Sequence, residues 1–137
     1  MGHIYTGGCA CGAVRYEKSG ETVAELLCQC QHCRQRSGAG HSAFLVFASR
    51  EGLVLHGAVK TWDVAGDSGN IKHHAFCPNC GTPLFVSFAA APDMIALHPG
   101  SLDDPSAFAP QFVTYNARGQ AWDALGAGVQ KFAMMPG

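Results

Sequence analysis

The chain has 137 residues, a length typical of one domain, and we expect residues 1–137 to form a single domain. Its 9 Lys and Arg against 10 Asp and Glu leave a formal charge of −1, so the basic surface that attracts nucleic acid is absent and a nucleic-acid partner is not expected. The N-terminus lacks a basic stretch followed by an apolar one, and no run reaches the roughly 18 apolar residues of a membrane span, so we expect a cytoplasmic protein without membrane association.

Short apolar stretches between turn signals predict a mostly β fold. The 17 glycines and 7 prolines that separate these stretches argue against a helix-rich fold. The predicted strands, in chain order, cover residues 3–5, 12–16, 22–27, 41–48, 53–56, 59–62, 72–76, 84–88, 95–98 and 111–115.

One or two short helices are expected near the C-terminal end. The clearest start lies in residues 101–108, where an aspartate that can cap a helix precedes Pro105 in the first turn. A second helix is predicted over residues 121–132, although Gly126 and Gly128 weaken it.

Seven cysteines occur in three tight groups. A disulfide framework is not expected, because seven is an odd number and bridges within a Cys-x-Cys pair are strained. Thiolates one or two residues apart converge readily on one tetrahedral zinc ion. The groups, which we interpret as zinc ligands, are Cys9 and Cys11, then Cys28, Cys30 and Cys33, then Cys77 and Cys80.

Counting the ligands predicts two zinc sites of different character. The complete four-cysteine site that leaves every group whole joins Cys9 and Cys11 to Cys77 and Cys80, and a closed site of this kind is structural. Cys28, Cys30 and Cys33 remain as three ligands of a second zinc. Three protein ligands leave one position for water or substrate, as in catalytic zinc sites.

Three motifs resemble those of the glutathione-dependent formaldehyde-activating enzyme and centromere protein V family. Residues 7–16 read GGCACGAVRY and match GGCxCGxVxY; residues 28–38 read CQCQHCRQRSG and match CxCxxCRxxSG. Residues 76–84 read FCPNCGTPL and match FCxxCGTPL, and a weaker tail motif corresponds to Arg118 and Trp122. The resemblance therefore spans about residues 7–122.

The resemblance implies a β-tent fold, with folded β-sheets held around zinc, and the same division into a structural and a second zinc site. It also implies a carbon–sulfur lyase activity in reverse, the condensation of glutathione with formaldehyde to S-hydroxymethylglutathione. Family members commonly carry Arg or Lys three residues before the third motif's first cysteine. This chain has His74 there, which puts a fixed cationic contact at that position in doubt.

A small thiol such as glutathione is the expected partner of the open zinc, because coordination favours the nucleophilic thiolate. Arg34 and Arg36 are candidate contacts for the carboxylates of such a thiol. The favoured alternative is that these arginines neutralise the charge of the thiolate-rich zinc. The sequence does not indicate an oligomeric state.

Two histidines, His32 and His41, lie in or near the second group. His32, inside the Cys30–Cys33 turn, is expected to point away from the ion its neighbours bind. His41 is a candidate proton relay. Two non-enzymatic alternatives remain open: a zinc-stabilised module that binds glutathione or a protein, and, less favoured because of the charge, a chromatin-associated domain.

Overall fold

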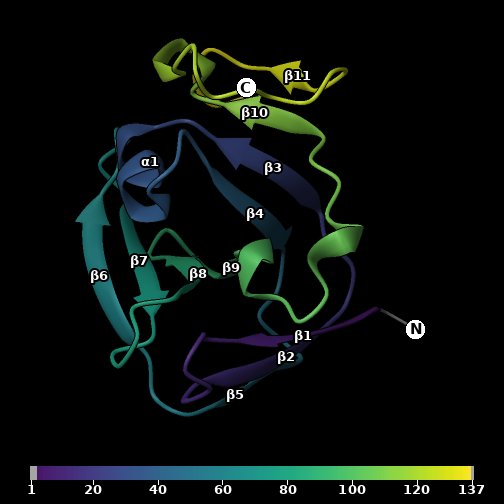
Figure 1. Cartoon of the computed structure of the whole chain (residues 1–137). Coiled ribbons are helices and arrows are strands. Elements are labelled where there is room, and N and C mark those ends of the chain that lie inside the picture. The colour runs from purple at the N-terminus through teal and green to yellow at the C-terminus, as the bar shows by residue number, and fades with distance from the viewer. Residues whose placement is uncertain (1–2, 137) are drawn as a thin grey trace.

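The computed structural model describes residues 3–136 and contains two β-sheets (Figure 1). The smaller sheet has three antiparallel strands in the order β1-β2-β5. These strands are β1 (Ile4–Gly8), β2 (Arg15–Ser19) and β5 (Leu53–His56). In Figure 1 this sheet lies below the rest of the molecule.

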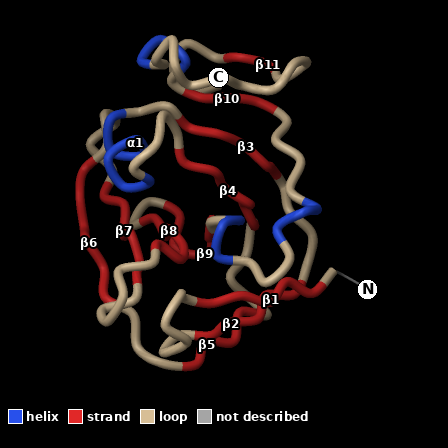
Figure 2. The backbone as a smooth tube through the Cα atoms, viewed as in Figure 1, coloured by secondary structure: helices blue, strands red, loops and turns tan. Residues whose placement is uncertain are grey.

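The larger sheet has eight strands in the order β11-β10-β3-β4-β9-β8-β7-β6. All neighbours are antiparallel except β10, which pairs in parallel with both β3 and β11. The prediction of a mostly β fold is thereby confirmed, as Figure 2 shows by colour. The strands are β3 (Ala24–Cys28), β4 (Ser42–Phe47), β6 (Lys60–Ala65), β7 (Ile71–Phe76), β8 (Pro83–Phe88), β9 (Ala91–Leu97), β10 (Phe112–Thr114) and β11 (Gln130–Lys131).

Helical structure differs from the sequence-based expectation. The one α-helix among residues 3–136 is α1 (Gln31–Ser37), within the second cysteine group, where no helix was predicted. The expected helix start appears only as the 3-10 turn η2 (Pro105–Ala107), in which Asp104 Oδ1 accepts from the Ser106 amide at 3.1 Å. The helix predicted over residues 121–132 is wrong: turns and extended chain lead into β11, with Gly128 in the left-handed region at φ 82°.

The remaining helical turns are η1 (Pro99–Ser101) and η3 (Asn116–Arg118). Within residues 3–136, every helix is too short and too polar to cross a membrane.

The central strands of the larger sheet bury side chains on both faces. Along β4, Leu45 and Phe47 belong to one apolar cluster, with Tyr16 of the smaller sheet, whereas Phe44 belongs to another cluster on the opposite face. This alternation follows from the two-residue period of a strand. The two faces pack against different partners: the first covers the smaller sheet, and the second covers α1 and Cys28, Cys30 and Cys33.

Candidate metal centres and pocket

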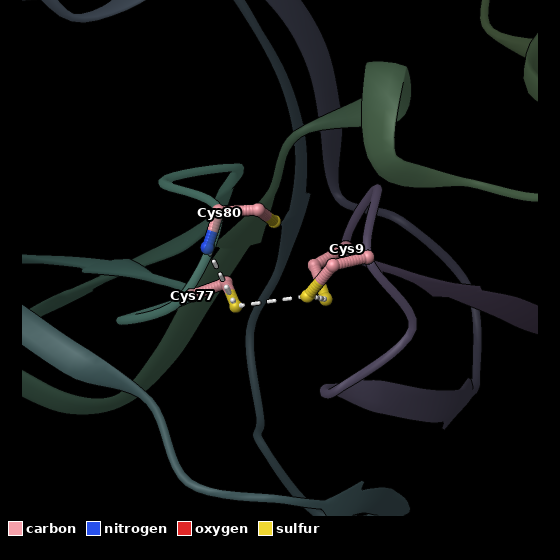
Figure 3. A group of neighbouring side chains, drawn as sticks. Cys9, Cys77 and Cys80 are labelled. Carbon is pink, nitrogen blue, oxygen red and sulfur yellow. Dashed lines mark hydrogen bonds between the residues drawn. The ribbon is translucent and has the colours of Figure 1, made fainter.

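The first and third cysteine groups meet at two hairpin turns. Cys9 and Cys11 lie between β1 and β2, and Cys77 and Cys80 lie between β7 and β8. Their four sulfur atoms all lie within 4.8 Å of one another. Figure 3 shows Cys9 and Cys77 pointing toward each other from these two turns. We call these four residues the four-cysteine cluster.

The backbone of each turn is shaped to present sulfur atoms. Gly12 follows Cys11 and Gly81 follows Cys80, with φ of 82° and 81°, a conformation that side chains disfavour. In each turn the glycine N–H donates to the carbonyl of the first cysteine, Cys9 or Cys77, at 3.2 and 2.8 Å. This explains why a glycine follows each pair in the sequence.

The sulfur spacing of the four-cysteine cluster fits a tetrahedral metal. Zinc–sulfur bonds of about 2.3 Å at tetrahedral angles separate neighbouring sulfur atoms by about 3.8 Å. The observed separations are 3.6 Å between Cys9 and Cys11 and 3.8 Å between Cys11 and Cys77. The Thr82 hydroxyl lies 3.1 Å from the Cys80 sulfur and helps to lower the pKa of Cys80 to about 5, which favours the thiolate that a metal requires.

The second group forms a separate cluster at the junction of β3 and α1, which we call the three-cysteine cluster. Cys28 ends β3, Cys30 caps α1 and Cys33 lies within the helix. All three are buried, and their sulfur atoms also lie within 4.8 Å of one another. The Cys33 amide donates to the Cys30 sulfur at 3.3 Å, so the sulfur itself caps the helix.

The three thiols of this cluster hydrogen-bond to one another, and these contacts shift their pKa values in opposite directions. Hydrogen bonds from the thiols of Cys28 and Cys33 lower the pKa of Cys30 to about 2. The same contacts raise the pKa values of Cys28 and Cys33. Three crowded thiols that hydrogen-bond in this way are a suitable donor set for a thiophilic cation.

Hydrogen bonds hold the segment of residues 116–123 next to the three-cysteine cluster. Gln29 is 1 % exposed, donates to Asp123 Oδ2 at 2.9 Å and accepts from Asn116 Nδ2 at 2.8 Å. His41 Nδ1 lies 2.8 Å from Asp123 Oδ1. A Cβ at Gly119 would lie 2.7 Å from Gln29 Oε1, so the chain passes too close for any larger residue. The candidate relay His41 therefore belongs to this network.

A pocket of about 60 Å³ opens beside Cys30. His32 lines this pocket and does not converge with the sulfur atoms of Cys28, Cys30 and Cys33. This agrees with the prediction that its side chain points away from their metal position. Arg34, Arg36 and His41 are not among the lining residues, so their proposed roles in substrate binding and proton transfer stay predictions. The complete lining is Cys30, Gln31, His32, Gly66, Asp67, Lys72, Tyr115 and Arg118.

Sequence reasoning missed several of these lining residues because two segments far from the second cysteine group, residues 66–72 and 115–118, supply them. Asp67 lies in the β6–β7 turn, Lys72 on β7 and Tyr115 just before η3. Tyr115 has φ 56° and ψ 35°, a left-handed conformation that is costly for a bulky residue. Its amide donates to the Met134 carbonyl at 3.2 Å, so the C-terminal segment helps to hold it there. Among the lining residues outside the second cysteine group, the tail motif had indicated Arg118.

Arg36 and His74 lie on an aromatic stack beside the pocket. The Arg36 guanidinium carbon is 5.1 Å from the Phe76 ring centroid and 6.0 Å from that of Trp62. His74 stacks on Trp62 at 5.5 Å, is 3 % exposed, and its Nε2 atom has no hydrogen-bond partner among the described residues. Burial, with the positive charge of Lys72, lowers the pKa of His74 to about 4.

We expect His74→Phe to stabilise the protein, because phenylalanine keeps the stack and removes the unpartnered nitrogen. At pH 7.5 the gain should be about 1 kcal/mol. It should grow as pH falls from about 6.5 toward 4, since the unfolded histidine binds a proton there and the native one does not. Urea unfolding midpoints at pH 7.5 and 5.0 measure both effects.

His73→Phe is the matched control, because His73 lies on the opposite face of β7 and pairs with Asp63 at 2.8 Å. It should give no stabilisation. An equal gain from both variants, or a gain from His74→Phe that does not change with pH, would contradict the assignment of His74 as a buried neutral imidazole.

Comparison with known proteins agrees with these motifs. A family model described as glutathione-dependent formaldehyde-activating enzyme matches residues 4–118. A protein of Halomonas elongata named "Putative glutathione-dependent formaldehyde-activating enzyme" is 31% identical over 101 residues, which cover 70% of this chain and 62% of that protein. The chain thus spans less than two thirds of that relative's length.

A solved structure of a Rhodobacter sphaeroides protein has the same fold. Its TM-score is 0.56 at 22% identity, and the match covers 72% of this chain and 87% of that one. The family match extends from β1 to the pocket residue Arg118 and includes all seven cysteines. The chain belongs to the glutathione-dependent formaldehyde-activating enzyme family.

Proposed function

We propose that the protein adds a small thiol such as glutathione to an aldehyde such as formaldehyde, a carbon–sulfur lyase reaction in reverse. The observation that carries this proposal is that the three-cysteine cluster borders a pocket through Cys30. The four-cysteine cluster has its full set of ligands and lies at two turns, which suits a structural role. Family membership supports the choice of thiol and aldehyde.

Both clusters fit zinc by their donor chemistry, since thiolates are preferred zinc ligands. In the four-cysteine cluster, the sulfur separations of 3.6 and 3.8 Å also match a tetrahedral site. Cys9, Cys11, Cys77 and Cys80 would hold the structural ion, and Cys28, Cys30 and Cys33 the second. An ion held by three thiolates would favour the thiolate form of an entering thiol and keep its sulfur nucleophilic.

The reaction forms one carbon–sulfur bond and breaks the π bond of the aldehyde, whose oxygen receives the proton that the thiol gives up. A donor near that oxygen would speed the step by stabilising its developing negative charge. Tyr115 is the candidate for this role, because it lines the pocket beside Cys30 and its phenol is a hydrogen-bond donor that is protonated at neutral pH. The residues around Cys30 would hold the thiol close to the aldehyde, which supplies proximity.

The experiment that tests this proposal follows the adduct by NMR during incubation of formaldehyde with several thiols, with and without protein. Because the addition also proceeds unaided, the measured quantity is the excess rate. We expect an excess that saturates with glutathione and is proportional to protein concentration. Thiol binding without any excess rate would contradict catalysis and indicate a binding module.

A further inference from the structure

The pocket beside Cys30 carries two cationic side chains, Lys72 and Arg118, and one anionic side chain, Asp67. Apart from Cys30, which belongs to the three-cysteine cluster, its lining therefore has one more positive than negative charged side chain. A cavity volume of about 10–15 Å³ suffices for one water molecule, so about 60 Å³ admits a group as large as a carboxylate. The pocket is thus suited to the anionic end of a ligand whose other end reaches the three-cysteine cluster.

Lys72 is the unpaired cation of this pocket. Among residues 3–136 its ammonium group has no ion pair, although its side chain is half-buried. Gly66 leaves room for it, because a Cβ at that position would lie 3.1 Å from Lys72 Cε and 3.5 Å from Nζ. A half-buried ammonium in a pocket favours an anionic ligand.

Arg118 is held on the other side of the pocket by two contacts. Its Nη2 lies 2.8 Å from Asp67 Oδ2, and its guanidinium carbon lies 5.3 Å from the Tyr115 ring centroid. A guanidinium has five N–H donors, so one ion pair leaves donors for a second anion. The Arg118–Asp67 pair is about half exposed, which makes it weak enough to rearrange around a ligand.

We propose that this pocket is a carboxylate subsite that selects thiols with an anionic end, with Lys72 as the specificity-determining residue and Arg118 as a second contact restrained by Asp67. The proposal rests on the proposed function, since it names the substrate class of the same site. It differs from the expectation for Arg34 and Arg36, because neither of those arginines lines the pocket.

A competing explanation is that Lys72 only balances the negative charge of the cysteine cluster. In that case its removal would weaken metal retention and affect all thiols alike. A carboxylate subsite instead predicts an effect confined to anionic thiols at unchanged metal content. The ligand pair that separates the two is glutathione and its diethyl ester, which share the thiol and differ in the carboxylates.

The test measures binding of both thiols by titration calorimetry, without aldehyde, to the metal-loaded wild-type protein, Lys72→Met and the control Lys60→Met. Lys60 is exposed on the neighbouring strand β6. We expect Lys72→Met to weaken glutathione binding at least about tenfold, the loss expected for one charge-assisted contact, and to leave the ester unchanged. Lys60→Met should match the wild type for both ligands.

Asp67→Asn provides a test in the opposite direction. It releases Arg118 and removes the negative charge of the pocket, so glutathione should bind about threefold more tightly while the ester is unaffected. The proposal is overturned if Lys72→Met binds glutathione as the wild type does, or if it weakens both thiols equally and loses metal.

Binding and turnover are measured separately, so the two proposals can fail separately. In the formaldehyde assay Lys72→Met should raise KM for glutathione and leave kcat nearly unchanged, because the contact is made equally in the ground state and the transition state. A carboxylate preference without any excess rate supports the subsite and rejects the lyase function. An excess rate with no preference for glutathione over its ester supports the lyase function and rejects the subsite.

Discussion

Replacement of Cys77 by serine should abolish the soluble folded protein. Cys77 is fully buried and joins the β7–β8 turn to the β1–β2 turn, 66 residues after Cys11. Closing a loop of this length contributes roughly 4 kcal/mol through the unfolded state by the relation used for disulfides, with metal–ligand free energy in addition. Because small domains are stable by only about 5–15 kcal/mol, losing this link should exceed the margin at 37 °C.

Soluble yield, far-UV circular dichroism and the zinc content of any recovered protein measure this effect. Cys80→Ser is the matched variant: Cys80 belongs to the same cluster but is exposed, so its serine hydroxyl is not buried in the core. If metal ligation is the cause, both variants should fail to fold. A Cys80→Ser protein with a wild-type melting curve would refute the structural role of the cluster and leave core packing as the explanation for Cys77.

Cys30→Ser should keep the fold and lose both the second metal and thiol turnover. Serine is a preferred N-cap residue, so its hydroxyl can replace the sulfur that accepts from the Cys33 amide. The remaining two thiols are a poor zinc site. Changes in outer-shell partners alone cost roughly 10–100-fold in metal affinity or activity, and loss of a ligand should cost at least roughly 100-fold.

Elemental analysis should show zinc falling from two ions to one per chain, and the formaldehyde assay should show the excess rate falling to the background. Gln35→Ala, on the exposed side of α1, is the control and should retain both ions. Turnover at the wild-type rate in Cys30→Ser would reject the three-cysteine cluster as the reaction site.

The two variants separate the proposed roles of the clusters because the clusters occupy different structural contexts. The four-cysteine cluster links turns from the two sheets, so its loss affects the whole chain. The three-cysteine cluster is buried against one face of the larger sheet, where Phe44, Val86 and Ala96 already pack. Those apolar contacts should maintain the fold when the second metal is lost.

Local patterns were sufficient for the strands and for the grouping of the cysteines. Short apolar stretches between glycines and prolines predicted nearly every strand, with ends displaced by a few residues. Helix α1 was missed because a cysteine at the N-cap is not a familiar cap signal, although its sulfur accepts from Cys33 as a serine hydroxyl would. The helix predicted over residues 121–132 does not form, and the prediction underestimated how strongly Gly126 and Gly128 disfavour a helix.

The sequence by itself determined which cysteines cluster together, because short Cys-x-Cys and Cys-x-x-Cys spacings leave few ways for their sulfur atoms to converge. Only the tertiary structure decided what surrounds the three-cysteine cluster. Lys72 comes from β7, whereas Tyr115 and Arg118 come from the segment after β10, which parallel pairing of β10 with β3 places beside Cys30. Such pairings depend on packing between residues far apart in the chain, which no local pattern encodes.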